Sequence, residues 1–173
     1  MRSGERPMTT AVLIGPPGSG KTTVGRLVAE RLGVDFRDTD ADVEAVAGKP
    51  VSDIFVEDGE ARFRELEHEA VGRALAEHDG VLSLGGGAVL NERTQALLQG
   101  HHVVYLQVGL ADAVQRVGLA SARPLLVLNP RSQLKKLMEE RRPVYERLAV
   151  TTVVTDRREP EELADEIVRG LPA

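Results

Sequence analysis

The sequence predicts an α/β fold in which helices cover both faces of a parallel β-sheet. Short apolar runs rich in β-branched residues alternate with segments whose apolar residues recur at helical spacing. A glycine-rich segment separates the first apolar run from the first helical segment, which is the usual context of a phosphate-binding loop. The length of 173 residues is enough for one domain and short for two.

Five runs are predicted to be strands because they are short, apolar and separated by helical segments. These runs are Thr10–Ile14, Val34–Phe36, Val81–Leu84, Val103–Val108 and Val150–Val154. The predicted helices are Lys21–Leu32, Asp42–Ala47, Ser52–Glu57, Glu60–Glu77, Glu92–Leu98, Ala111–Val117, Ser132–Ala149 and Pro160–Arg169. Gly33 and Gly48 stand at the positions of C-terminal caps, and Ser52 and Asp53 are typical of the N-terminal cap of a helix.

Two segments show neither pattern. Residues 1–8 (MRSGERPM) are polar and are predicted to be a disordered tail, which leaves 9–173 as a single domain. The stretch 118–130 contains glycine, serine, asparagine and two prolines and has little helical period. A loop of this length is usually functional or disordered, so we predict a mobile lid at about 118–130.

The composition excludes several classes of function. The chain has no cysteine, which rules out a disulfide framework, a thiolate zinc site and a cysteine nucleophile. Its 22 basic and 27 acidic residues give a formal net charge of −5, which argues against nucleic-acid and anionic-membrane partners. No apolar run approaches the roughly 20 residues of a membrane span, and the N-terminus lacks the apolar core of a signal peptide. We therefore expect a cytoplasmic monomer.

The glycine-rich segment matches the phosphate-loop pattern G-x-x-x-x-G-K-[ST] in full, as GPPGSGKT at 15–22. Backbone N–H groups of such a loop turn inward around phosphates, and the following helix N-terminus adds partial positive charge. Lys21 is expected to reach the β- and γ-phosphates of a nucleotide, and Thr22 to ligate Mg²⁺. The expected nucleotide-binding residues of this loop are Gly18, Ser19, Gly20, Lys21, Thr22 and Thr23.

Two carboxylates follow the second predicted strand. Asp38 and Asp40 are two residues apart, and in an extended chain this spacing puts both side chains on one face. One can support the metal and the other can orient a substrate hydroxyl, although helix capping beside a solvated turn explains the same residues. Nucleotide-driven switches and motors need an aspartate at the end of a further strand. Here the third strand leads into Gly85, Gly86 and Gly87 instead, which favours a small-molecule kinase.

Charged residues interrupt the apolar stripe of two predicted helices. Glu67 falls inside the stripe of the fourth helix, three residues after Arg64, so it either forms an ordinary pair on one helix or orients Arg64 toward an anionic ligand. Arg141 lies on the stripe of the seventh helix, where its guanidinium either snorkels, pairs within the protein or binds a substrate carboxylate. Gly85 to Gly87 form either a tight turn or a corner whose backbone approaches a ligand closely.

Four further positions are weaker candidates. Arg123 stands in the predicted lid, where a closing arginine can supply charge to a transferring phosphoryl group, or where it is an ordinary solvated arginine. Arg116, Arg158 and Pro160 either pack around a nucleotide base or are ordinary surface residues.

Taken together, these motifs resemble those of the shikimate kinase family. The resemblance runs in order from about Ala11 to Pro160 and rests on GPPGSGKTT (15–23), DTD (38–40), FRELE (63–67), LGGGA (84–88), RPLL (123–126) and RRPVYE (141–146). It implies a three-layer α/β/α P-loop kinase fold with a five-stranded parallel sheet in the order 2-3-1-4-5. It also implies ATP and Mg²⁺ as cofactors and phosphorylation of the 3-hydroxyl of shikimate, in the biosynthesis of aromatic amino acids.

The resemblance assigns roles to individual residues. In the family pattern, shikimate would be held by Asp40, Arg64, the corner around Gly86, and Arg141, and Asp40 would accept a hydrogen bond from the attacking hydroxyl. Lys21 and Arg123 would act on the phosphoryl group, and Thr22 would ligate Mg²⁺ with Asp38 behind a water. Arg116, Arg158 and Pro160 would border the base of ATP. A kinase for gluconate or a nucleoside monophosphate, or a non-catalytic nucleotide-binding module, remains an alternative from the residue types alone.

Overall fold

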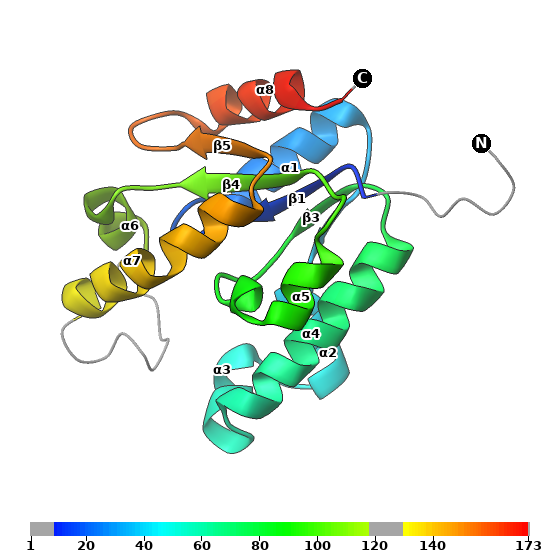
Figure 1. Ribbon diagram of the computed structural model, residues 1–173, viewed down its shortest axis with the longest axis vertical. Helices are drawn as coiled ribbons and strands as arrows, with labels where there is room; N and C mark the ends of the chain where they lie inside the picture. Colours follow the sequence, from blue (N-terminus) through cyan, green and yellow to red (C-terminus); the bar gives the residue numbers. More distant parts are fainter. Residues whose placement is uncertain (1–8, 118–129, 173) are drawn as a thin grey trace, which may run out of the picture.

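Five parallel strands form one sheet in the order β2-β3-β1-β4-β5, which confirms the order that the resemblance implied. The computed structural model describes residues 9–117 and 130–172 of the chain. The strands are β1 (Ala11–Ile14), β2 (Phe36–Asp38), β3 (Val81–Ser83), β4 (Val103–Gln107) and β5 (Thr151–Val154). Because the strands are parallel, their carboxyl ends share one edge of the sheet, at the left in Figure 1. Ligands of open α/β sheets bind at this edge.

Helices cover both faces of the sheet (Figure 1), because the side chains of each strand alternate between the two faces. Val12 and Ile14 of β1 belong to one buried cluster, and Leu13 belongs to the other. The first cluster packs against α4 (Glu60–Glu77), α5 (Glu92–Leu97), α7 (Pro130–Leu148) and the short 3₁₀ helix η1 (Ala88–Leu90). The second packs against α1 (Lys21–Leu32) and α8 (Pro160–Gly170).

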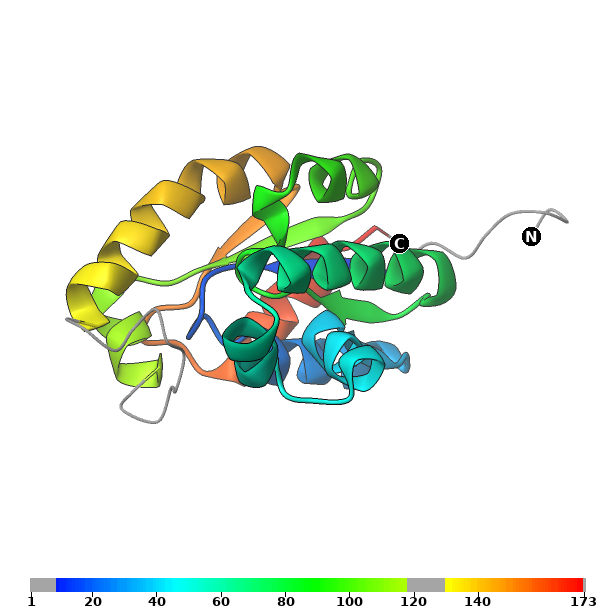
Figure 2. The same cartoon turned by 90° about the horizontal axis from the view of Figure 1, so that it is seen from below.

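Two smaller clusters extend this core. The helices α2 (Thr39–Ala47) and α3 (Val51–Glu57) pack on α4 through Val43, Ile54 and Phe63, and the three helices lie together in Figures 1 and 2. The helix α6 (Leu110–Val117) packs on α7 through Ala113 and Leu134. None of the helices in the described ranges is both long and apolar enough to cross a bilayer.

The prediction for the second strand and the following helix was wrong. The strand lies at Phe36–Asp38 instead of Val34–Phe36, and the helix begins at Thr39 instead of Asp42. The cause is a cap, because Asp38 Oδ1 accepts a hydrogen bond from the Asp40 N–H at 2.9 Å. Asp38 therefore ends the strand while Asp40 lies in the first helical turn. The two side chains do not share the face of an extended segment.

The other predicted elements are present, with ends that differ by at most two residues. The helix predicted from Ser52 begins at Val51, so Pro50 and not Ser52 is its N-terminal cap residue. The helix at Lys21–Leu32 begins and ends as predicted, between Gly20 and Gly33 in left-handed conformation. The helix predicted from Ser132 begins at Pro130, and the 3₁₀ turn η1 was not predicted. The tail at 1–8 and the rest of the lid, 118–129, lie outside the described residues.

Candidate active site

The phosphate loop connects β1 to α1, and its backbone carbonyls contact the side chain of Lys21. The Lys21 ammonium donates to the carbonyl of Gly15 at 2.7 Å and to that of Pro16 at 3.1 Å. A side chain at Gly15 would place its Cβ 2.6 Å from the Leu106 carbonyl oxygen, so only glycine lets the loop pass this close to β4. The loop thus holds a cation at its centre and leaves the N-terminus of α1 open.

A cavity of about 500 Å³ adjoins this loop at the carboxyl edge of the sheet. It joins the phosphate loop to the ends of β2 and β3, which are neighbours in the sheet. Its walls are Pro17, Gly18, Gly20, Lys21, Thr22, Thr23, Asp38, Asp40, Ser83, Leu84, Gly85, Gly86 and Arg116. Five of the six expected nucleotide residues of the loop, both aspartates and part of the glycine corner therefore face one space, whereas Ser19 is fully buried and does not line it.

The groups for a magnesium ion lie in this cavity. Thr22, which has a hydroxyl group, and Asp38, which has a carboxylate, both line the cavity. Burial raises the pKa of Asp38, while the Asp40 N–H and the charge of Lys21 work in the opposite direction. No cluster of three or more His, Cys, Asp or Glu side chains among residues 9–117 and 130–172 could hold an ion alone. This donor set fits Mg²⁺, which is usually bound by one or two protein oxygens together with substrate phosphates and water.

Charged side chains occupy the space that Cβ atoms would take at the glycine corner between β3 and η1. A Cβ at Gly85 would lie 2.7 Å from Asp40 Oδ1 and 2.9 Å from Glu67 Oε2. A Cβ at Gly87 would lie 2.5 Å from Arg64 Nη2. The sequence left two interpretations of the glycines, a tight turn or a backbone that approaches a ligand closely. In the structure they let charged side chains approach the backbone, which does not decide between the two.

Glu67 and Arg64 form an ion pair one turn apart on α4. The Arg64 Nη1 donates to Glu67 Oε1 at 2.7 Å, and Arg64 also lies 5.2 Å from the centre of the Phe63 ring. Burial raises the pKa of Glu67, whose side chain is only 3% exposed, and the charge of Arg64 lowers it. A buried carboxylate is costly unless it is paired. Glu67 therefore fixes the Arg64 guanidinium beside Gly87.

Arg141 reaches the same corner from α7. The residue is 7% exposed, and a Cβ at Gly86 would lie 3.2 Å from its Nη1. Within the described part of the chain, no carboxylate lies within 4.0 Å of its guanidinium. The nearby Tyr145 donates its hydroxyl proton to the Gly86 carbonyl at 2.5 Å. Arg64 and Arg141 thus flank the corner from two helices that are far apart in sequence.

Sequence reasoning missed the contribution of Tyr145. Its position on the apolar stripe of α7 indicated a core residue, and the ring is indeed buried. The spacing of four residues from Arg141 was the available signal, because residues so spaced lie on one helix face. Nothing in the sequence placed the Gly86 carbonyl opposite the hydroxyl.

Two of the remaining candidates, Arg116 and Arg158, are held by contacts within the protein. The Arg116 Nη1 donates to the Gly18 carbonyl and to Thr155 Oγ1, both at 3.2 Å, so it connects the phosphate loop to the end of β5. Arg158 donates to the Val154 carbonyl at 3.2 Å and to Glu166 at 2.9 Å, and it does not line the cavity. Pro160 is the first residue of α8. Arg123 lies outside the described residues.

The chain is similar to known kinases along almost its whole length. The family model described as "Shikimate kinase" matches residues 17–172. A curated "Shikimate kinase" from Salinispora arenicola is 64% identical over 162 residues, which cover 94% of this chain and 97% of that protein. The solved "Shikimate kinase from Acinetobacter baumannii in complex with shikimate" is 36% identical with a TM-score of 0.90, covering 95% of this chain and 93% of that one.

A gluconokinase is a more distant structural relative. The solved enzyme from Sinorhizobium meliloti is 21% identical with a TM-score of 0.58, covering 96% of this chain and 93% of that one. This likeness shows the shared fold alone, whereas the matching family model and the 64% identity decide the family. The chain belongs to the shikimate kinase family.

Proposed function

We propose that this chain transfers the γ-phosphoryl group of ATP to the 3-hydroxyl of shikimate, giving shikimate 3-phosphate and ADP. One observation carries the mechanism: Lys21, Thr22 and Asp40 face a single cavity of about 500 Å³. A nucleotide bound at the loop would therefore present its terminal phosphate toward the carboxylate. The family to which the chain belongs supports the choice of substrate.

The nucleotide end of the cavity is proposed to bind MgATP. Backbone N–H groups of Gly18, Ser19 and Gly20, with Thr23, would surround the phosphates at the start of α1, where the helix dipole favours negative charge. Lys21 would exchange its contacts with the loop carbonyls for the β- and γ-phosphates. Thr22 and Asp38 would hold Mg²⁺, directly and through a water, and the ion would neutralise phosphate charge.

Arg116, Arg158 and Pro160 are proposed to border the base of ATP. Arg116 is the best supported of them, because it lines the cavity and contacts the phosphate loop. Arg123 is proposed to bring a further positive charge to the transferring phosphoryl group, as lid arginines do in related reactions.

The substrate end is proposed to hold shikimate at the glycine corner. Arg64 and Arg141 would bind the carboxylate of shikimate. A guanidinium has two parallel N–H donors whose spacing matches the two oxygens of a carboxylate. Glu67 would keep Arg64 in place through the 2.7 Å contact. The backbone of Gly85, Gly86 and Gly87 would form the floor of this subsite.

Asp40 is proposed to accept the hydrogen bond of the attacking hydroxyl. The hydroxyl oxygen forms a bond to the γ-phosphorus, the bond from that phosphorus to the bridging oxygen of ADP breaks, and the hydroxyl proton passes to Asp40 or to solvent. Positioning and charge stabilisation supply most of the rate in phosphoryl transfer. The main task of these residues is therefore to bring both reactants together at the carboxyl edge of the sheet, where Asp40 lines the cavity and the two arginines flank the adjoining glycine corner without lining it.

A substrate panel read by ADP release tests the proposal. Shikimate should be turned over far faster than gluconate or a nucleoside monophosphate. Asp40→Asn should lower kcat by about 100-fold or more while the KM for ATP stays within about twofold, because general-base and positioning effects act on the transferring step. Preferred turnover of gluconate, or an equal loss of ATP affinity in Asp40→Asn, would overturn the assignment.

A further inference from the structure

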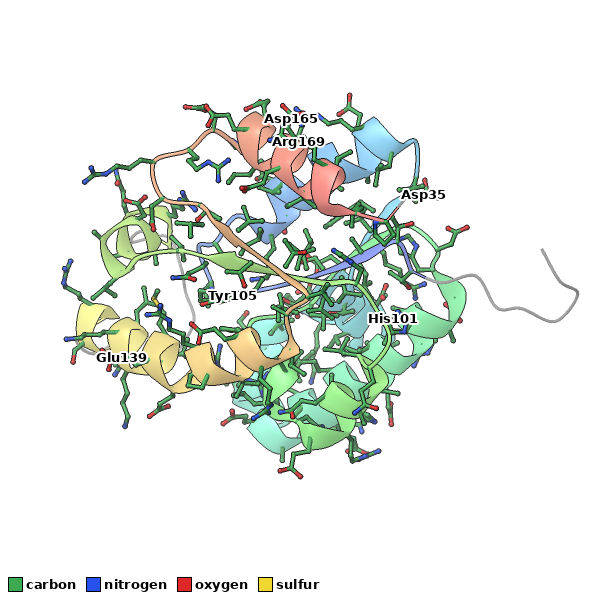
Figure 3. All side chains as sticks on the ribbon, turned by 45° about the horizontal axis from the view of Figure 1, so that its top comes forward. Asp35, His101, Tyr105, Glu139, Asp165 and Arg169 are labelled. Carbon is green, nitrogen blue, oxygen red and sulfur yellow. The ribbon has the colours of Figure 1, made fainter. Side chains whose placement is uncertain are left out.

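The hydroxyl of Tyr145 connects two parts of the substrate site that come from distant segments of the chain. Tyr145 lies on α7 with 1% of its surface exposed, and it donates to the carbonyl of Gly86 across 59 positions in sequence. Its ring stacks on Tyr105 of β4 at 5.0 Å between ring centres and an interplanar angle of 26°. Figure 3 shows Tyr105 on β4, facing α7. The ring is therefore fixed by packing, and the direction of its hydroxyl is fixed with it.

Arg141 stands one helical turn before Tyr145 on the same face of α7. Burial raises the pKa of Tyr145 to about 12, and the nearby charge of Arg141 works against that rise. The phenol therefore keeps its proton near neutral pH. It can accept from the Arg141 guanidinium while it donates to Gly86, and Arg141 Nη1 lies 3.2 Å from the position of a Gly86 Cβ.

We propose that Tyr145 is a positioning residue that holds the Arg141 guanidinium against the glycine corner and thereby sets the affinity of the enzyme for the substrate carboxylate. This inference rests on the proposed function, because it requires Arg141 to bind that carboxylate.

The chemistry of Arg141 explains why such a residue is needed. A guanidinium gains its advantage over an ammonium only when its plane is aligned with the carboxylate. Arg141 has no carboxylate within 4.0 Å among the described residues, so no ion pair of the kind that holds Arg64 fixes its plane. The Tyr145 hydroxyl, itself fixed by Tyr105 and Gly86, can supply that restraint.

Tyr145→Phe tests this role because it removes the hydroxyl and keeps the stacked ring. We expect the KM for shikimate, and the dissociation constant measured by calorimetry, to rise about 10-fold, while kcat and the KM for ATP stay within about twofold. Tyr105→Phe is the matched control. It also removes one hydroxyl from the stacked pair, but Tyr105 lines a different cavity, of about 220 Å³, beside Pro16 and Met138. It should leave all three constants unchanged.

A second measurement does not depend on how much of the variant is folded. The measurement compares kcat/KM for shikimate with kcat/KM for an analogue that carries a neutral carboxamide in place of the carboxylate. In Tyr145→Phe, the preference for shikimate over this analogue should fall about 10-fold. In the Arg141→Lys background, which lacks the planar guanidinium, adding Tyr145→Phe should change the KM for shikimate by less than about twofold. Additive effects of the two substitutions would contradict a role through Arg141.

The outcomes separate this inference from the proposed function. If the wild-type protein turns over shikimate and Tyr145→Phe behaves like Tyr105→Phe, Tyr145 does not position Arg141 and the inference is wrong. If the wild-type protein does not turn over shikimate at all, the proposed function itself fails.

Discussion

Adding one methyl group at Gly87 should weaken substrate binding because the new methyl group displaces Arg64. Gly87 has φ −98° and ψ 0°, a backbone conformation open to alanine, so Gly87→Ala brings no strain of left-handed geometry. The new Cβ would lie 2.5 Å from Arg64 Nη2, 2.6 Å from Nη1 and 2.8 Å from Cζ. Ordinary contact begins at 3.4 Å, so the guanidinium must move by about 0.9 Å.

The size of the effect follows from the contact that this movement breaks. Arg64 Nη1 and Glu67 Oε1 are 2.7 Å apart, so a shift of about 0.9 Å directed away from Glu67 takes them beyond the range of about 3.2 Å for a hydrogen bond. A hydrogen bond to a charged group contributes about 1.5–3 kcal/mol. Because a misplaced Arg64 loses one such hydrogen bond to the substrate carboxylate, the KM for shikimate should rise by roughly 10- to 150-fold. The KM for ATP should stay within about twofold, because the phosphate loop is not touched.

Steady-state kinetics beside thermal melting is the assay, with Gly72→Ala as the control. Gly72 lies within α4, and its Cβ would meet only Leu97 Cδ1 at an ordinary 3.6 Å. That substitution should leave both KM values unchanged and stabilise the helix by up to about 1 kcal/mol. A folded Gly87→Ala protein with a wild-type KM for shikimate would refute the reasoning that the glycine corner positions Arg64.

Three further perturbations address the other parts of the site. Lys21→Met should reduce turnover to near background with little change in Tm, because Lys21 acts on phosphate charge; wild-type kcat would contradict the phosphate-loop assignment. Arg141→Lys should raise the KM for shikimate about 10-fold or more. Arg141→Leu should abolish substrate binding while changing Tm by less than about 4 °C. If Arg141→Leu instead lowers the free energy of unfolding by about 3–5 kcal/mol, Arg141 belongs to a structural ion pair. Burial raises the pKa of Asp38, so kcat/KM should decrease on acidification at a pH above the usual aspartate pKa of about 3.9. A decrease only at or below that pH would show that an ionised Asp38 is not required.

Much of the fold follows from local sequence patterns. The alternation of Val12, Leu13 and Ile14 between two buried clusters, and the glycines at both ends of α1, are sequence features that the structure uses directly. The second strand was misplaced because its residues are only half-buried and carry little apolar signal. The cap formed by Asp38 then decided where the chain turns into a helix, and that cap depends on one side-chain contact.

The candidate site was predictable in its residue types and less so in its arrangement. The charges of Glu67 and Arg141 on apolar stripes indicated that both needed partners. The pairing of Glu67 with Arg64 was one of the two interpretations considered, and the contact exists. The contacts of the three glycines with charged side chains, and of Tyr145 with Gly86, join segments far apart in sequence, which no local pattern encodes. The lid, the monomeric state and the cytoplasmic location stay predictions.

The most direct test of the proposed function is to identify the phosphorylated product. Purified protein would be incubated with MgATP and shikimate, and the product examined by phosphorus–proton correlation in NMR. We predict a single phosphate ester whose phosphorus couples to the proton on carbon 3, formed together with ADP. No phosphorylated shikimate, or a phosphate on another hydroxyl, would contradict the placement of shikimate between Asp40 and the two arginines.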